Sequence, residues 1–163
     1  MKRIIIIGCP GSGKSTLARE LQTRTHLPLY YLDMLYWNAD RTTVSKEEFR
    51  RRLGEVLATD AWIIDGNYGS TMEMRMAVCD TVLFLDYPTE LCLAGIHARR
   101  GKVRPDMPWV ETGEDAEFEA FVRQFREEKR PQVYALLEKY REKEIHVFHD
   151  RAEAAAFLER LPV

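Results

Sequence analysis

The sequence predicts an α/β fold in which helices cover both faces of a five-stranded parallel sheet. Apolar runs of strand length alternate along the chain with segments of helical periodicity, which is typical of parallel strands joined by crossover helices. A length of 163 residues and a hydrophobic content of 45% suit one domain with one core. We therefore expect a single domain over residues 1–163.

Five apolar runs predict the strands. The first contains four consecutive isoleucines, is too short for the apolar region of a signal peptide, and leads directly into glycines. A segment of helical length separates each run from the next, so successive strands can be joined by crossovers. The strands are expected at residues 3–7, 29–32, 62–64, 81–85 and 144–148.

Helix signals lie between and after these runs. Ser45 and Glu48 have the spacing of a capping box, and the fixed φ of Pro88 suits a first helical turn. Pro131 must kink or divide the helical segment between residues 118 and 140. The remaining predictions place helices at residues 15–24, 45–58, 71–78, 88–100 and 152–161.

Residues 101–112 contain Gly101, Pro105 and Pro108 and show no sustained periodicity. Glycine and proline interrupt regular structure, so we expect a surface loop there. The loop is a candidate for a small mobile lid that covers about residues 101–117.

Charge and cysteine content argue against some classes of protein. The formal net charge is −2 and the pI is about 6.1, which disfavours direct nucleic-acid binding. Cys9, Cys79 and Cys92 form neither a CxxC metal pattern nor an even disulfide set, so we expect free thiols in a reducing compartment. No stretch approaches the roughly 20 apolar residues of a membrane span. The expectation is a cytoplasmic protein without a membrane partner, either a monomer or a homodimer.

A glycine-rich segment carries the clearest functional signal. Residues 8–15 match the pattern GxxxxGK[ST] directly after an apolar run and directly before a helical segment. Glycines let backbone N–H groups approach phosphate oxygens, and the helix N-terminus adds a partial positive charge. The predicted ATP-binding residues are Gly8, Pro10, Gly11, Ser12, Gly13, Lys14, Ser15 and Thr16. Lys14 would reach the β- and γ-phosphates as a catalytic residue, and the Ser15 hydroxyl would coordinate Mg²⁺. The competing interpretation is a turn that binds nothing.

Two acidic residues follow predicted strands, at the edge where doubly wound folds place their ligands. Asp33 would accept the proton of an acceptor hydroxyl as a catalytic base, or else cap the turn that follows it. Asp65 would hold Mg²⁺ or orient the acceptor, or else start a turn before Gly66. The aromatic residues around Asp33 would stack on a base or pack in the core; they are Tyr30, Tyr31, Tyr36 and Trp37.

Five segments of the chain resemble the bacterial DNA topology modulation protein family, which is related to adenylate kinase. They are GCPGSGKST at 8–16, PLYYLDMLYW at 28–37, WIIDGNYGST at 62–71, TVLFLDYP at 81–88 and ARRGKVRPD at 98–106. The resemblance covers nearly the whole chain. It implies a P-loop nucleoside triphosphate hydrolase fold of the nucleoside monophosphate kinase-like type, with strand order 2-3-1-4-5 and a small lid. The family name describes a regulatory phenotype and does not establish a reaction.

Arginines around the lid are candidates for stabilising the charge that spreads over a migrating phosphoryl group. The resemblance points to two zones, with Arg99, Arg100 and Arg104 in the first and Arg123, Arg126 and Arg130 in the second. Those assigned as catalytic are Arg99, Arg100 and Arg130, although a surface ion pair is an alternative for each.

The sequence leaves two alternative roles for each of two further residues, Arg75 and Asp86. The Gly-Phe-Pro-Arg of adenylate kinase does not follow Asp65, which disfavours AMP as acceptor. Arg75 would either replace the missing arginine or lie on a solvated helix face. Asp86 ends the fourth strand and would either cap the next helix or serve function.

Three hypotheses about function follow. The first is an ATP-dependent phosphotransferase, with ATP and Mg²⁺ as cofactors, that acts on a nucleoside, a nucleotide or another small hydroxylated acceptor. The second is an ATP-binding regulatory protein that affects DNA topology with little or no kinase activity, and the third is a plain ATPase. GTPases are disfavoured because the chain lacks the Asn-Lys-x-Asp and Asp-x-x-Gly motifs. Asp33 favours a hydroxyl acceptor, since an acceptor that is already a phosphate needs no base.

Overall fold

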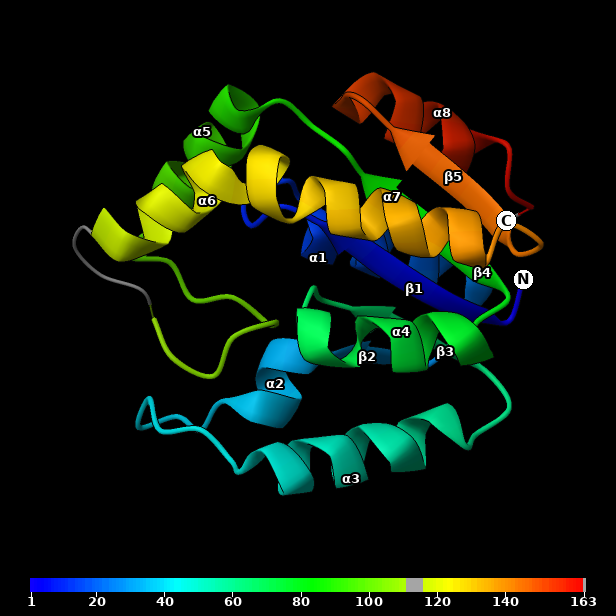
Figure 1. Ribbon diagram of the computed structural model, residues 1–163, viewed down its shortest axis with the longest axis horizontal. Helices are drawn as coiled ribbons and strands as arrows, with labels where there is room; N and C mark the ends of the chain where they lie inside the picture. The colour runs from blue at the N-terminus through cyan, green and yellow to red at the C-terminus, as the bar shows by residue number, and fades with distance from the viewer. Residues whose placement is uncertain (111–115, 163) are drawn as a thin grey trace.

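The computed structural model describes residues 1–110 and 116–162, and its centre is a parallel sheet (Figure 1). The strands are β1 (Arg3–Gly8), β2 (Leu29–Tyr31), β3 (Trp62–Asp65), β4 (Thr81–Leu85) and β5 (Glu144–Phe148). Their order, β2-β3-β1-β4-β5, confirms the predicted order 2-3-1-4-5. Because β3 and β4 flank β1, the segments that follow these strands meet at the carboxyl edge of the sheet.

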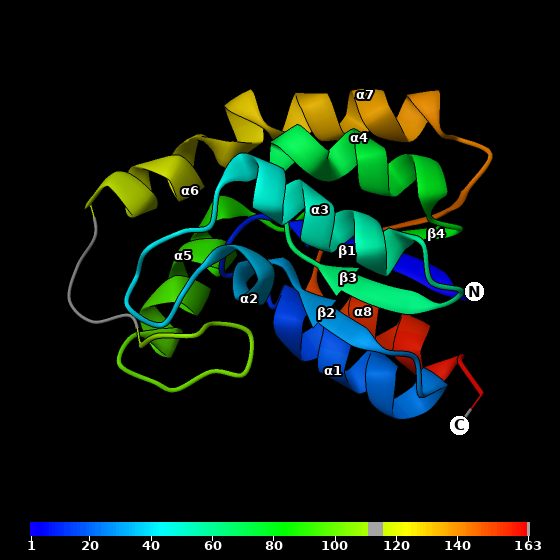
Figure 2. The ribbon, with the colours of Figure 1, turned by 90° about the horizontal axis from the view of Figure 1, so that it is seen from below.

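Helices pack on both faces of the sheet, as predicted (Figure 2). They are α1 (Lys14–Thr25), α2 (Leu32–Tyr36), α3 (Lys46–Leu57), α4 (Gly69–Val78), α5 (Thr89–Arg99), α6 (Ala116–Glu128), α7 (Arg130–Lys139) and α8 (Arg151–Glu159). Side chains of β1 alternate between two apolar cores. Ile4 and Ile6 pack in the core shared by α1, α5, α6 and α8, whereas Ile5 and Ile7 pack in the core shared by α3, α4 and α7. All four isoleucines are fully buried, so β1 is anchored from both sides.

Local signals place several helix ends correctly. The Ser45 hydroxyl accepts a 3.1 Å hydrogen bond from the Glu48 N–H and caps α3, as predicted. Pro131 divides its segment: α6 ends at Glu128 and Pro131 lies in the first turn of α7, where its missing N–H costs nothing. Pro88 is the N-cap of α5. The three cysteines are buried and free, as expected.

The end of the second strand differs from the prediction. The strand was expected over residues 29–32, but β2 ends at Tyr31 and Leu32 begins α2, a short helix that the sequence did not predict. Leu32 is fully buried, and a buried apolar residue suits a strand and a helix equally. Other boundaries differ by at most two residues. Asp33 therefore lies in the first turn of a helix rather than directly after a strand.

The predicted lid, about 101–117, is described only in part. Residues 111–115 lie outside the described residues, 101–110 contain neither helix nor strand, and 116–117 open α6. The segment 101–110 reaches the turn after α2, where Arg41 donates a 3.3 Å hydrogen bond to the Val110 carbonyl. Within the described residues, no helix combines the length and apolar character required to cross a bilayer.

Candidate active site

The glycine-rich segment turns sharply between β1 and α1 because two of its glycines adopt positive φ. The angle is 85° at Gly11 and 98° at Gly13, the N-cap of α1. A Cβ at Gly11 would lie 2.0 Å from the carbonyl oxygen of Cys92, and a Cβ at Gly95 would lie 2.0 Å from the carbonyl oxygen of Gly11. Only glycine at both places lets α5 pack this closely and fix the shape of the turn.

The part of this turn at the N-terminus of α1 has free space and polar groups around it. A Cβ at Gly13 would meet no atom within 4 Å, and the Ser12 hydroxyl is buried without a hydrogen-bond partner in the described chain. Lys14 donates a 3.3 Å hydrogen bond from Nζ to the Cys9 carbonyl, which holds its ammonium group across the turn. An unpaired hydroxyl, free space at a helix N-terminus and an ammonium group fit the oxygen atoms and charge of nucleotide phosphates.

Asn67 and Arg75 hold the turn between β3 and α4 against the glycine-rich segment. The Gly8 N–H donates to Asn67 Oδ1 at 3.0 Å, and the Asn67 amide donates back to the Gly8 carbonyl. Arg75 is fully buried and donates to the three carbonyls of residues 66–68. Burial lowers the pKa of its guanidinium to about 9. The solvated helix face considered for Arg75 is therefore wrong.

Sequence reasoning missed Asn67. Its position after Asp65 and Gly66, at the end of an apolar strand, was the available signal, because that strand pairs with β1. A polar side chain at this place can continue the hydrogen bonding of the sheet to the start of the glycine-rich segment.

Asp33 is held by a tyrosine from the neighbouring turn. The Tyr68 hydroxyl donates a 2.5 Å hydrogen bond to Asp33 Oδ1. Burial raises the pKa of Asp33 above its usual range, and the hydrogen bond from Tyr68 offsets part of that shift. Tyr68 has a φ of 37°, a left-handed conformation that bulky residues rarely adopt. Strained residues of this kind cluster at functional sites.

Asp65 is a second buried carboxylate, with 6% of its surface exposed at the end of β3. Burial raises its pKa to about 7; the charge of Lys14 opposes the shift and that of Asp106 adds to it. Within the described residues the Asp65 carboxylate makes no hydrogen bond or ion pair, so it can accept a cation. Asp106, in the segment 101–110, is a third carboxylate at this place and was not singled out from the sequence.

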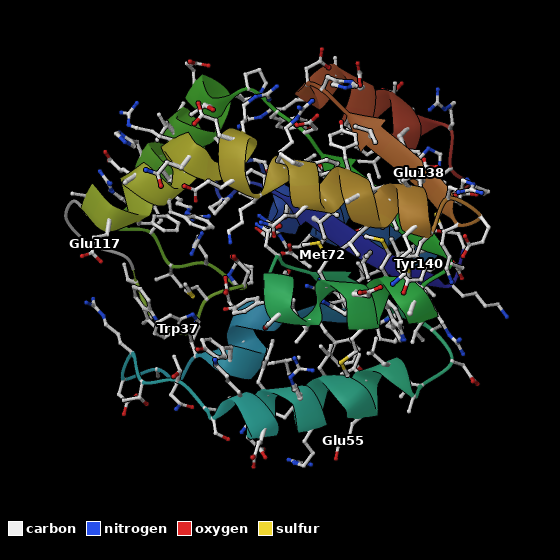
Figure 3. The ribbon with its side chains drawn as sticks, viewed as in Figure 1. Trp37, Glu55, Met72, Glu117, Glu138 and Tyr140 are labelled. Atoms are coloured by element: carbon white, nitrogen blue, oxygen red, sulfur yellow. The ribbon has the colours of Figure 1, made fainter. Side chains whose placement is uncertain are left out.

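One cleft of about 1330 Å³ brings most of the predicted site residues together. Its lining includes Pro10, Gly11, Gly13, Lys14, Ser15, Thr16, Asp33, Asp65, Arg99 and Arg100. Gly8 and Ser12 are outside the lining, although Gly8 is tied to it through Asn67. Trp37 and Glu117 also line the cleft, and Figure 3 shows them toward the same end of the molecule. Residues far apart in the sequence thus share one surface.

The flanking arginines and aromatic residues differ in their surroundings. Arg100 donates a 2.7 Å hydrogen bond to Glu119, and the Arg99 guanidinium lies 5.8 Å from the centre of the Phe118 ring. Of the aromatic residues predicted around Asp33, those that line the cleft are Tyr31 and Trp37. The ring of Tyr36 packs in the core against Phe49 and Tyr68.

Arg130 is not part of the cleft lining but forms an ion pair with Asp86. Its Nε donates to both carboxylate oxygens, at 2.8 and 3.0 Å, and the Tyr134 hydroxyl donates to Oδ2 at 2.6 Å. Burial alone would raise the pKa of Asp86, but these hydrogen bonds hold it below its usual range. Asp86 does not cap α5, so that interpretation is wrong. The pair instead fastens α7 to the end of β4.

Comparison with known proteins agrees with this architecture. No protein-family model and no curated protein sequence matches the chain, so the resemblance to DNA topology modulation proteins stays a prediction. A shikimate kinase from Bacteroides thetaiotaomicron is 21% identical, with a TM-score of 0.62 over 98% of this chain and 95% of that one. A shikimate kinase from Acinetobacter baumannii in complex with shikimate is 18% identical, with a TM-score of 0.64 over 98% and 90%. A gluconokinase from Sinorhizobium meliloti 1021 is 16% identical, with a TM-score of 0.56 over 98% and 92%. The chain has the P-loop kinase fold of these structures.

Proposed function

We propose that the protein is an ATP-dependent phosphotransferase that moves the γ-phosphoryl group onto a hydroxyl group of a small-molecule acceptor. The observation that carries the proposal is that the glycine-rich turn and Asp33 line the same cleft. A phosphate-binding turn and an acid in the same cleft are the two parts that transfer to a hydroxyl requires. The likeness in fold to a kinase solved with shikimate bound supports this proposal.

The residues of the turn would hold the triphosphate, and those beside it would hold the metal ion. When bound, ATP would supply the phosphoryl group and Mg²⁺ would neutralise part of the phosphate charge. Ser15 and Asp65 would be the protein ligands of Mg²⁺. No group of three or more metal-binding side chains occurs among the described residues, and Mg²⁺ ordinarily takes one or two protein ligands together with substrate phosphates.

Asp33 would accept the proton of the acceptor hydroxyl as the hydroxyl oxygen attacks. A raised pKa makes this carboxylate a stronger base than an exposed aspartate, and Tyr68 fixes its orientation through Oδ1. Lys14, Arg99 and Arg100 line the cleft and would stabilise the charge of the migrating group. Arg130 would act only through the position of α7, because its guanidinium is bound to Asp86.

The test is coupled ADP release from ATP and Mg²⁺ over a panel of nucleosides, nucleoside monophosphates, sugars and small alcohols. We expect acceptor-dependent turnover that Lys14→Ala abolishes. In Asp33→Asn turnover should fall about 100- to 10,000-fold while ATP still binds. Asp60→Asn, at an exposed carboxylate before the amino end of β3, is the matched control and should keep full turnover.

Two outcomes would contradict the proposal. ATP binding without acceptor-dependent turnover would favour the regulatory protein, and phosphate release without any acceptor would favour a plain ATPase. Unchanged turnover in Asp33→Asn would remove Asp33 from the mechanism.

A further inference from the structure

Basic side chains outnumber acidic ones in the lining of the cleft. Among the described residues, nine lysines and arginines line it, against four carboxylates, those of Asp33, Asp65, Asp106 and Glu117. One of the nine, Arg100, pairs with Glu119, which lies outside the lining. Bound Mg²⁺ would neutralise part of the triphosphate charge, so the nucleotide alone leaves some of the positive charge uncompensated. A cleft with this excess attracts a second anion besides ATP.

The three aspartates of the lining have cations of their own. Burial raises the pKa of Asp33 and of Asp65, and the charge of Asp106 adds to both shifts. The charge of Lys14 opposes both shifts, and that of Arg104 opposes the shift of Asp33. Nη1 of Arg104 also lies 3.8 Å from Oδ2 of Asp106. These carboxylates are therefore compensated by cations next to them.

Arg41 lines the cleft without a carboxylate beside it. Its guanidinium lies 4.7 Å from the centre of the Trp109 ring, and Nη2 donates a 3.3 Å hydrogen bond to the Val110 carbonyl. Neither contact neutralises the charge, and Arg41 forms no ion pair within the part of the chain that the structure describes. Arg41 is exposed, so its remaining N–H groups are accessible to a ligand.

The backbone places Arg41 on the side of the cleft that carries Asp33. Arg41 has a φ of 69°, a left-handed conformation, in a turn where its N–H donates a 3.0 Å hydrogen bond to the Asn38 carbonyl. Trp37 joins this turn to α2, the helix of Asp33, and its ring lies 5.8 Å from that of Trp109. The guanidinium is thus held in one orientation. A planar guanidinium held in this way can bind a carboxylate or a phosphate with two parallel hydrogen bonds.

We propose that the acceptor carries an anionic group, a carboxylate or a phosphate, in addition to the hydroxyl that receives the phosphoryl group, and that Arg41 binds this anionic group. The N–H groups of Arg41 donate to the oxygens of the anion, while Asp33 serves the hydroxyl. The positive charge of the whole cleft attracts the acceptor, and Arg41 orients it. This inference rests on the proposed phosphoryl transfer and adds the substrate class.

The test compares acceptors that are similar in shape and differ in charge. D-Gluconate and D-glucose 6-phosphate are paired with D-glucose, and shikimate is paired with methyl shikimate. We expect kcat/KM for the preferred anion to exceed that of its uncharged partner by at least about tenfold. A preference confined to the carboxylates, or to the phosphate, would support the inference and identify the anionic group.

Variants of Arg41 assign the preference to this residue. Arg41→Gln should raise the KM of the preferred anion by about 10- to 100-fold and leave the KM of ATP and of the uncharged partner unchanged. Arg41→Lys keeps the charge without the planar fork, so its KM should lie between the two. Arg50→Gln is the matched control and should change no KM. Arg50 is also exposed and also donates to a backbone carbonyl, that of Ser70 at 3.0 Å, but it lies outside the lining.

The outcomes separate this inference from the proposed function. Equal or higher kcat/KM for the uncharged member of every pair would overturn the inference and leave phosphoryl transfer standing. The same holds if Arg41→Gln leaves the KM of the anion unchanged, or raises the KM of charged and uncharged acceptors equally, which would reflect the packing of Trp109 alone.

If no compound is phosphorylated, calorimetry decides the matter in titrations of the same compounds into the protein with Mg²⁺ and the β,γ-imido analogue of ATP. An anion that binds at least about tenfold more tightly than its uncharged partner, and loses this advantage in Arg41→Gln, would support the inference. If the unmodified protein binds none of the anions, or binds them no more tightly than their uncharged partners, the inference is wrong.

Discussion

Tyr68 donates its phenolic hydrogen to Oδ1 of Asp33 over 2.5 Å, from a turn that follows the strand next to β2. Burial raises the pKa of Asp33, and this hydrogen bond stabilises the ionised form and counters the shift. The ring of Tyr68 also packs against Tyr36 and Phe49, which fixes the phenol in place. The pH dependence of the proposed phosphoryl transfer would therefore report on the contact between these two residues.

Tyr68→Phe removes the hydrogen bond and keeps the ring. The pKa of Asp33 then rises, because burial still acts and the phenol no longer opposes it. Since a general base must be ionised, we expect the acidic side of the pH profile of kcat/KM, the acid limb, to shift to higher pH by about one unit. Steady-state kinetics from about pH 5 to pH 9 measure this limb. Tyr36→Phe is the control and should leave it in place; an unmoved limb in Tyr68→Phe would argue against Asp33 as the base.

Asp65→Asn should stabilise the ligand-free protein at neutral and alkaline pH. The pKa of Asp65 is about 7 in the folded chain, against an ordinary value of 3.8, so the folded state binds more protons between these values. The unfolding free energy that this residue contributes is thus lost as pH rises from about 4 to about 7. The asparagine variant does not ionise at this position, so its unfolding free energy does not fall for this reason. The gap in unfolding free energy between variant and unmodified protein should widen by about 2–3 kcal/mol from pH 5 to pH 8.

Urea unfolding at the two pH values measures this gap, with Asp60→Asn as the control for the loss of one carboxylate. A gap that narrows with rising pH would show that Asp65 is ionised and compensated in the folded protein. Weaker binding of Mg²⁺ with ATP in Asp65→Asn would accompany the gain in stability if Asp65 is a metal ligand.

Features that depend on neighbouring residues in the sequence were predictable. The motif at 8–15 is contiguous, so the position of Lys14 between strand and helix could be read directly. The cap at Ser45 and the division at Pro131 are also local, because each follows from one side chain and its adjacent backbone. The order of the strands came from the family resemblance, since local patterns do not state which strands pair.

Contacts between distant residues account for what sequence reasoning missed. Asn67 and Gly8 are 59 residues apart, and Arg130 and Asp86 are 44 apart. An arginine on a helical segment looks the same whether it will face a phosphate or pair with a buried carboxylate. Asp106 lies in a loop, where an acidic residue is ordinarily solvated, yet only 7% of its surface is exposed in the folded chain.

Arg130→Ala should destabilise the protein rather than act first on catalysis. The variant would remove the cation whose Nε donates to both oxygens of the Asp86 side chain, which is 2% exposed, while Tyr134 and the 3.6 Å ion pair with Arg126 remain. We expect a loss of about 2–4 kcal/mol in unfolding free energy by urea denaturation at pH 7. The pKa of Asp86 is held low in the folded state, so this contribution is present above the ordinary aspartate pKa and fades as pH falls below it.

Arg141→Ala provides the control, because Arg141 and Glu138 form an ion pair with both side chains about three-quarters exposed, at 74% and 76%. Its removal should change the unfolding free energy by less than about 1 kcal/mol. Lost turnover in Arg130→Ala with an unchanged unfolding free energy would instead support the catalytic role predicted from the sequence.

Gly95→Ala should damage nucleotide binding from outside the glycine-rich segment. The added Cβ would lie 2.0 Å from the carbonyl oxygen of Gly11, so α5 or the turn must move. We expect a destabilisation of about 1–3 kcal/mol and a loss of ATP affinity of at least about tenfold, measured by urea unfolding and titration calorimetry.

Gly54→Ala is the matched control: Gly54 also lies inside a helix, α3, and a Cβ there would meet no atom within 4 Å. Alanine should stabilise that helix by about 0.5–1 kcal/mol and leave ATP binding intact. Equal ATP affinity in the two variants would mean that the contact between α5 and Gly11 does not set the shape of the phosphate turn.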